Sequence, residues 1–200
     1  MATKRKGYMT LAEHHARLKA EGKWDEYAAR KKAQDEEFRR KEEDYSRAEA
    51  PVVEALRTAG VPISSVWDLV NATNTHEQSL PILLDHLQRP YPDGVREGIA
   101  RALAVPAAKC AWPLLIKLYR QESARRTKDG LAVAISNIAD DGLLDELIEL
   151  AQDDTHGESR VLLLNALERS RLPKARKALM ELGGDPVLQK EVQQILRRLK

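Results

Sequence analysis

The chain repeats its apolar pattern every 32 residues, and this repeat limits its possible folds more than any other feature of the sequence. One column at this step is all leucine, and it consists of Leu83, Leu115, Leu147 and Leu179. Three more apolar columns keep the step, and they consist of Ile99, Leu131, Leu163 and Ile195, of Leu103, Ile135, Leu167 and Leu199, and of Ala102, Ala134 and Ala166. A fixed period of this size is typical of proteins built from stacked supersecondary units.

Each repeat predicts two helices joined by a short turn. Within a repeat the apolar positions fall three or four residues apart, which is helical spacing. Pro81 and Pro113 suit a first helical turn, where the missing N–H costs nothing. One helix pair cannot bury its apolar faces alone, so the pairs should stack on one another. We expect clear units at about residues 79–106, 111–139, 142–171 and 173–199, and a degenerate one at 49–73.

Residues 1–48 differ from the repeats and predict charged helices. Thr10 and Glu13 have the spacing of a capping box, and Gly22 should end the helix that they start. A second helix should run from Trp24 or Asp25 to about Ala48. Its aromatic seam consists of residues at multiples of seven, namely Trp24, Phe38 and Tyr45, with Val52 beyond. The seam should lie against the same protein, which is the favoured interpretation, or against a partner helix in a coiled coil.

Two segments resemble the HEAT-repeat family. They are Leu80-Pro-Ile-Leu-Leu84 and Asp93-Gly-Val-Arg-Glu-Gly-Ile-Ala-Arg-Ala-Leu103, with a proline-containing apolar helix, a turn aspartate and Val-Arg early in the next helix. The resemblance covers residues 79–199 well and 49–73 weakly, and the later units lose the turn aspartate. It implies an all-α fold, a right-handed α-solenoid with an N-terminal helical extension, and a binding role in which the second helices line the binding surface.

Composition excludes several classes of protein. Both signs of charge are interleaved and the net charge is only +2, whereas a dedicated nucleic-acid binder is usually more basic. The single cysteine, Cys110, cannot form an internal disulfide, and we expect it to be a small packing residue. No apolar run reaches the length of a membrane span. These features predict a cytoplasmic protein that does not contact a membrane.

The sequence offers no set of residues suited to catalysis, metal binding or a cofactor. Its histidines are scattered, and only His76-Glu77 forms a His-Glu pair. His14 and His15 are adjacent, so they cannot chelate one ion as residues four apart on a helix would. Gly183-Gly184 reads as a helix stop because no phosphate-binding motif surrounds it. We therefore predict no metal, no cofactor and no enzymatic activity.

A basic column could contact phosphates. Arg96, Lys128 and Arg160 keep the 32-residue step along the second helices, and such a ladder would suit a nucleic acid. The favoured interpretation is that each basic residue forms an ion pair with an acidic residue of the adjoining unit, because Glu97 and Asp129 lie on the same helices.

Two neighbouring columns change their chemistry from unit to unit, unlike the core columns, and predict a binding face. One contains Arg101, Val133 and Asn165, and the other contains Glu97, Asp129 and Val161. A mixture of apolar groups and both charges suits a protein partner better than a polyanion. The resulting hypothesis is a protein-binding adaptor or inhibitor, of which small immunity or antitoxin-type proteins are one example. The alternative is a nucleic-acid-binding or DNA-repair-type protein. An enzyme that handles a cofactor or chromophore ranks last.

Overall fold

The computed structural model describes residues 9–72 and 77–199, and within these ranges the chain is helical without a strand. The all-α prediction is therefore confirmed. The internal contacts of the chain group into two compact units, Met1–Arg47 and Ala48–Lys200, which we call unit 1 and unit 2.

Unit 1 contains α1 (Leu11–Ala20) and most of the length of α2 (Trp24–Thr58). Thr10 accepts a hydrogen bond from the Glu13 N–H, while the Glu13 carboxylate accepts one from the Thr10 N–H, as the capping-box prediction requires. Gly22 has φ +67°, a conformation that favours glycine, between the two helices. α1 packs on the start of α2 through His15, whose ring lies 4.9 Å from that of Trp24.

α2 extends beyond the end predicted from the sequence. It continues through Pro51 to Thr58, whereas we expected it to stop near Ala48. A proline inside a helix removes one backbone hydrogen bond, which usually ends or kinks the helix. Val52 and Leu56 directly after it are fully buried, and the burial of such side chains offsets the lost bond.

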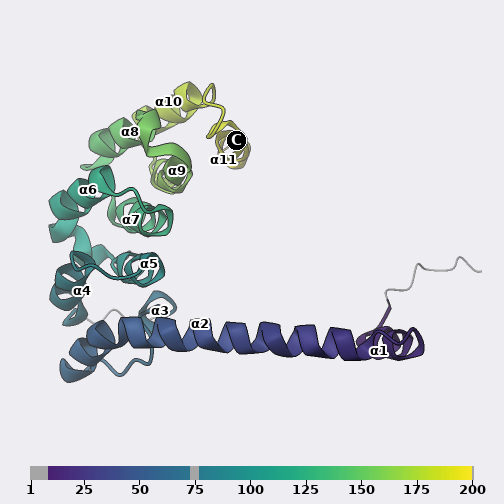
Figure 1. Cartoon of the computed structure of the whole chain (residues 1–200). Coiled ribbons are helices and arrows are strands. Elements are labelled where there is room, and N and C mark those ends of the chain that lie inside the picture. Colours follow the sequence, from purple (N-terminus) through teal and green to yellow (C-terminus); the bar gives the residue numbers. More distant parts are fainter. Residues whose placement is uncertain (1–8, 73–76, 200) are drawn as a thin grey trace, which may run out of the picture. The chain divides into compact units, whose positions relative to one another are not determined.

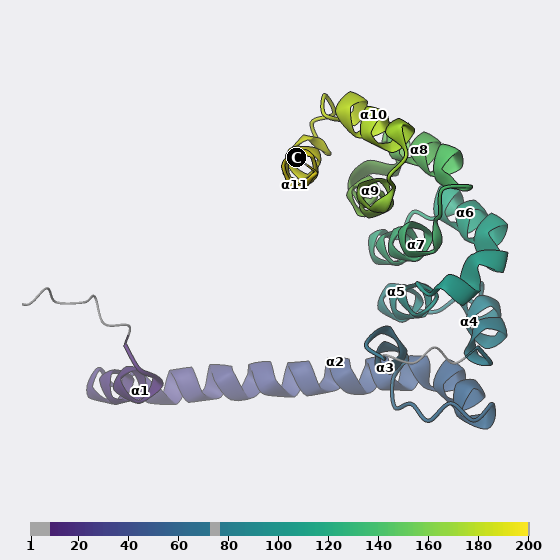
Figure 2. The same ribbon diagram turned by 180° about the vertical axis from the view of Figure 1, so that it is seen from behind.

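Unit 2 places its helices in two layers (Figures 1 and 2). The first-helix layer contains α4 (Ser79–Leu87), α6 (Trp112–Gln121), α8 (Leu144–Gln152) and α10 (Pro173–Leu182). The second-helix layer contains α5 (Asp93–Ala102), α7 (Arg125–Ile138), α9 (Arg160–Arg169) and α11 (Gln189–Arg198). Each helix contacts its partner in the other layer, and α5, α7 and α9 contact one another in succession. α3 (Val66–Val70) packs on α5.

The predicted core columns are buried between these layers. The leucines at positions 83, 115, 147 and 179 are fully inaccessible, as are Ile99, Leu131, Leu163 and Ile195. Leu103, Ile135 and Leu167 are equally inaccessible, so the helical register derived from the repeat is confirmed there. Leu199, the last residue of the column that begins at Leu103, is only half-buried.

Gly130 brings α5 and α7 close together. A Cβ atom at this position would lie 2.8 Å from the backbone oxygen of Glu97, which is too close for any real side chain. The close contact between α5 and α7 therefore requires glycine at this position. This contact brings the start of α7 against Glu97 of α5.

Two short 3₁₀ helices connect the layers, η1 (Pro106–Ala111) and η2 (Asp154–Ser159). Cys110 lies in η1 and is exposed, so the expectation of a packing role is wrong. The side chains of Ala108 and Ala111 fill the space beneath η1 instead. Across the described ranges, no single helix has both the length and the apolar character needed to cross a membrane.

Candidate functional site

The six residues predicted to bind a partner lie on three adjacent helices, and we call them the second-helix ridge. The ridge consists of Glu97 and Arg101 on α5, Asp129 and Val133 on α7, and Val161 and Asn165 on α9. Asn165 is exposed, whereas Arg101, Asp129 and the two valines are half-buried. Glu97 is only 8% exposed, so its assignment to an outward column is wrong.

Glu97 is buried because two arginines neutralise its carboxylate. Arg101, one helical turn later, donates to Oε1 at 2.9 Å. Arg126, from the start of α7, donates to Oε2 at 2.7 Å. Two charge-assisted hydrogen bonds offset the cost of taking this carboxylate out of water. Glu97 therefore links α5 to α7.

Asp129 occupies the same position one repeat later, but both of its expected cations are absent. The residue equivalent to Arg101 is Val133, and the residue equivalent to Arg126 is Glu158. The nearest basic group is the Arg125 guanidinium, whose Nε lies 4.0 Å from Oδ2 of Asp129. Arg125 itself pairs with Glu158. Among the described residues, no hydrogen bond to the Asp129 carboxylate is present at 3.5 Å or less.

The surroundings of Asp129 disfavour its negative charge. Burial raises the pKa of its carboxyl group, and Arg125 offsets this only in part. The nearby carboxylates of Glu97 and Glu158 raise that pKa further, while Arg101 opposes them. A raised carboxyl pKa means that the charged form lacks compensation in the folded protein. A cation brought by another molecule would supply that compensation.

Asp129 lines a groove of about 410 Å³ between α7 and η2. Lys128 and His156 line the same groove. Lys128 donates to the backbone oxygen of Glu122 at 3.1 Å and lies over the Tyr119 ring, 5.3 Å from its centroid. Burial lowers the pKa of the His156 imidazole, and Lys128 lowers it further, so His156 adds no positive charge near neutral pH.

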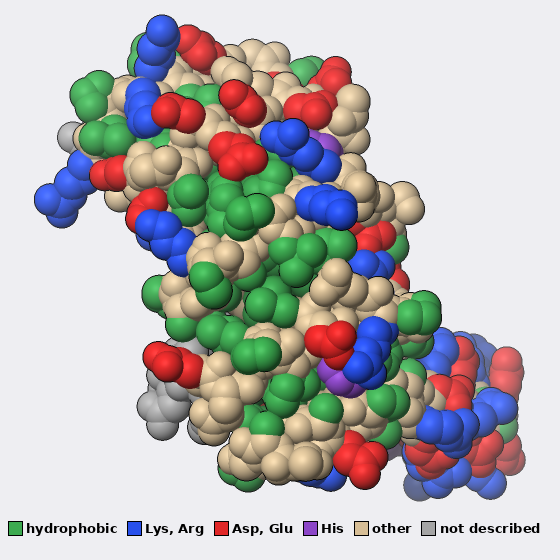
Figure 3. Space-filling view, turned by 90° about the vertical axis from the view of Figure 1, so that its left-hand side faces the viewer, with side chains coloured by type: hydrophobic (Ala, Val, Ile, Leu, Met, Phe, Trp, Pro, Cys, Tyr) green, Lys and Arg blue, Asp and Glu red, His purple; other side chains and the backbone are tan. Residues whose placement is uncertain are grey.

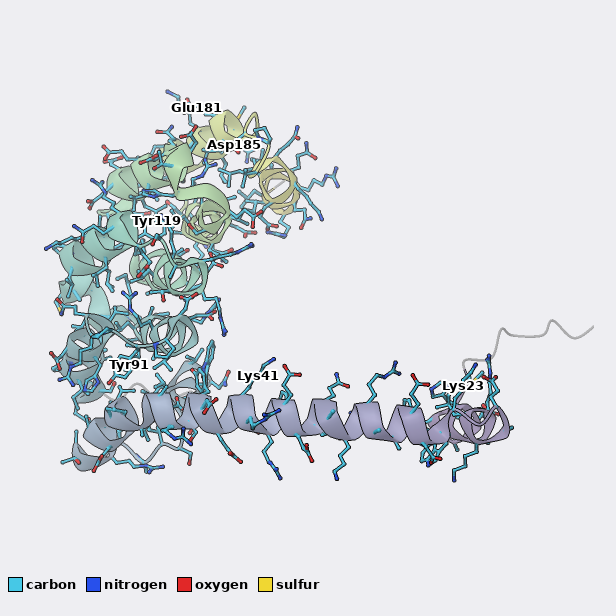
Figure 4. All side chains as sticks on the ribbon, viewed as in Figure 1. Lys23, Lys41, Tyr91, Tyr119, Glu181 and Asp185 are labelled. Atoms are coloured by element: carbon cyan, nitrogen blue, oxygen red, sulfur yellow. The ribbon has the colours of Figure 1, made fainter. Side chains whose placement is uncertain are left out.

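Tyr119 is buried and contacts three residues that line the groove, namely Ser159, Lys128 and His156. Its hydroxyl lies 2.9 Å from Oγ of Ser159, which in turn donates to the backbone oxygen of His156 at 2.8 Å. Burial raises the pKa of Tyr119 to about 12, so the hydroxyl stays protonated. Figure 4 places Tyr119 between the two layers of unit 2.

The basic column predicted as phosphate contacts is engaged within the protein. Nη1 of Arg96 lies 2.5 Å from Oε2 of Glu122, which belongs to the next helix pair of unit 2. Arg160 is only 2% exposed, and its Nη1 donates to Oδ2 of Asp185 at 2.7 Å. The assignment of Arg160 to phosphate contact is therefore wrong, because its guanidinium lies in the protein interior. Arg96 and Arg160 therefore agree with the favoured interpretation of the column, whereas Lys128 donates to a backbone oxygen and not to an acidic side chain.

The histidines in the described ranges do not form a metal site. No group of three or more His, Cys, Asp or Glu side chains in those ranges is placed to hold a metal ion. His86 instead places Nδ1 2.6 Å from the hydroxyl of Tyr91. His76, of the His76-Glu77 pair, lies outside the described residues. The absence of metal and cofactor from the whole chain stays a prediction.

The first-helix layer carries an apolar surface that the sequence analysis did not predict. Hydrophobic side chains gather along this face in Figure 3. Met180 is 65% exposed, Pro81 and Pro113 are exposed, and Ile82 and Leu114 are half-buried. The two prolines were interpreted only as helix starts. A signal was present, since an apolar residue follows each of them, at Ile82 and Leu114.

Comparisons of the chain with protein-family models, with curated proteins and with solved structures find no match.

Proposed function

We propose that this protein is a HEAT-like α-solenoid that binds another protein through the second-helix ridge, as a cytosolic adaptor or inhibitor without enzymatic activity. The observation that carries the proposal is Asp129, a half-buried carboxylate that has lost both cations found around its counterpart Glu97. Such a charge destabilises the free protein and becomes useful when a ligand supplies the missing cation.

The groove indicates the chemistry of the partner. A lysine or arginine of the partner would enter the groove and pair with Asp129. Val133, one helical turn after Asp129, and Val161 on α9 are half-buried and would add apolar contact to the interface. Asn165 on α9 is exposed and would offer hydrogen bonds to the partner. A buried anchor with a polar rim is the usual anatomy of a protein interface.

A nucleic acid is the less favoured partner. Its phosphates would need free cations, but Arg96 and Arg160 are committed to Glu122 and Asp185. Asp129 and Glu158 would repel phosphates at the groove. The ridge therefore supports recognition of a basic protein segment over recognition of a polyanion.

Affinity capture from the native host tests this proposal with two variants. Asp129→Asn removes the charge with little change in shape, and it should lose the captured protein. Val133→Arg places an arginine where α5 has Arg101, so an internal cation should occupy the groove and exclude the partner. Glu149→Gln, an exposed carboxylate of α8, serves as the matched control and should retain the partner.

Thermal stability distinguishes loss of binding from loss of the fold in Asp129→Asn. Because the pKa of Asp129 is raised in the folded state, its charge opposes folding at neutral pH. Asp129→Asn should therefore unfold at the same temperature as the wild type or higher. If Asp129→Asn, folded by this criterion, still captures the same protein as the wild type does, the ridge is not the binding site.

A further inference from the structure

The exposed part of α2 carries a pattern that unit 2 lacks. Every residue from 29 to 44 is exposed. Phe38, in the middle of this stretch, is 69% exposed, which is unusual for an aromatic side chain. Figure 4 shows side chains projecting from opposite sides of α2 between Lys23 and Lys41. A helix that exposes an aromatic residue on one side has an unpartnered face.

A groove of about 700 Å³ on the same unit offers a site for an aromatic side chain. Part of its wall consists of Leu11 and His15 of α1 and of Lys32, Asp35, Glu36 and Arg39 of α2. The rest of its wall consists of Trp24, Tyr27, Ala28 and Lys31. With Trp24 at heptad position a, these residues occupy positions a, d, e and the next a. Four residues at such positions form the hole that receives one side chain of a facing helix in a coiled coil.

The charges of α2 identify the facing helix. Heptad position g is occupied by Lys23, directly before α2, and by Arg30, Glu37 and Asp44 within it, in the order plus, plus, minus, minus. In an antiparallel pair of identical helices, position g of one copy faces position g of the other. Placing Phe38 of one copy opposite Tyr27 of the other brings Arg30 beside Glu37 and Lys23 beside Asp44. Each pair forms twice, by symmetry.

The geometry points to an antiparallel dimer of this protein, formed by α2 of two copies, with Phe38 of each copy in the groove of the other. The heptad register requires only that position a faces position d, and among the alignments that meet this requirement the charge pattern selects this one. In this alignment Trp24, whose ring lies 4.9 Å from Nζ of Lys19 in the same copy, faces Lys41 of the second copy. Lys31 faces Gln34 in the polar central layers, so the dimer should be weak and should depend on concentration.

Sedimentation of the full-length chain tests the dimer. The wild type should move from one copy of 22.5 kDa toward twice that mass as its concentration rises. Phe38→Ala should remain a monomer over the same range, because it removes the side chain that fills the groove. A wild type that stays monomeric at every concentration would overturn the proposal.

Charge exchange tests the antiparallel register. Arg30→Glu alone and Glu37→Arg alone should each be monomeric, since each places like charges side by side. The double variant Arg30→Glu/Glu37→Arg should dimerise again, because both pairs are restored with reversed sign. An equimolar mixture of the two single variants should form a heterodimer for the same reason.

Two control variants change the charge equally but at positions turned away from the seam. Arg40→Glu lies at position c and Glu43→Arg at position f, and both should dimerise like the wild type. Circular dichroism should show that the helical content of every variant is retained. If the double variant and the mixture stay monomeric with full helical content, the antiparallel alignment is wrong.

Discussion

Unit 1 and unit 2 hold their helices by different physical means. In unit 2 the helices are short and amphipathic, and residues such as Leu115 are completely removed from water. In unit 1, α2 is exposed on all sides from residue 29 to residue 44. Burial of apolar surface therefore holds unit 2 together, whereas local interactions along the chain must maintain the exposed part of α2.

The ion pairs show the same contrast. Those of α2 join residues one turn apart, for example Lys31 to Asp35 at 3.0 Å and Lys41 to Glu37 at 2.6 Å, and all of these side chains are more than half exposed. In unit 2, Arg160 and Asp185 join sites 25 residues apart, and the arginine is buried. Exposed pairs along a helix support its local conformation, whereas a buried pair between helices fixes their arrangement.

The largest expected effect comes from placing a charge in the core of unit 2. Leu115→Asp should unfold unit 2 or lower its free energy of unfolding by several kcal/mol, because an unpaired carboxylate replaces a fully buried leucine. Leu11→Asp in α1 is the comparison, since Leu11 is 67% exposed and the change should barely matter. Thermal denaturation followed by circular dichroism measures both. Equal stability of the two variants would show that the two units do not differ as described.

A smaller effect is expected from removing a buried cation. Arg160→Ala leaves Asp185 without its partner and opens a cavity, which should cost about 3 kcal/mol. The matched change in unit 1 is Arg17→Ala, which removes an exposed pair with Glu21 and should leave stability almost unchanged, because water screens such a pair. Urea denaturation can resolve this difference, and a cost for Arg160→Ala as small as that for Arg17→Ala would contradict the structural role given to the buried pair.

The sequence predicted most of unit 2 because its core positions recur in three or four repeats. One leucine in a column says little, but Leu83, Leu115, Leu147 and Leu179 together specify the face that each first helix buries. The end of α2 was missed because Pro51 has no repeat equivalent to show that the residues after it are buried. Cys110 was misplaced for a similar reason, since η1 interrupts the repeat.

The candidate site was harder to predict because its chemistry depends on contacts between helices. The sequence pattern predicted Glu97 as a surface residue, whereas in the structure Arg126, 29 positions later, contacts its carboxylate. Asp129 lacks the two arginines that pair with Glu97, because positions 101 and 126 correspond to Val133 and Glu158 one repeat later. The sequence contained this information, but only the contact of α5 with α7 identified which positions to compare.

The smallest expected effect concerns pH. Burial lowers the pKa of both His86 and His156 in unit 2, so the unfolded chain takes up protons there more readily than the folded chain does. Stability should therefore fall as the pH drops through about 6.5, the ordinary pKa of histidine. Thermal unfolding at pH values above and below this point should show the loss. His86→Gln/His156→Gln should reduce that dependence, and an unchanged dependence would contradict the assignment to these two histidines.

Hydrogen exchange of the full chain, measured free and in complex with its captured protein, locates the binding surface. Binding at the second-helix ridge should slow exchange in the first turns of α7 and α9 and in η2, around Asp129. The amides of α4, α6 and α8 should exchange as they do in the free protein. Protection confined to that first-helix layer, with α7 and η2 unchanged, would contradict the account and assign binding to the apolar face around Pro81 and Pro113.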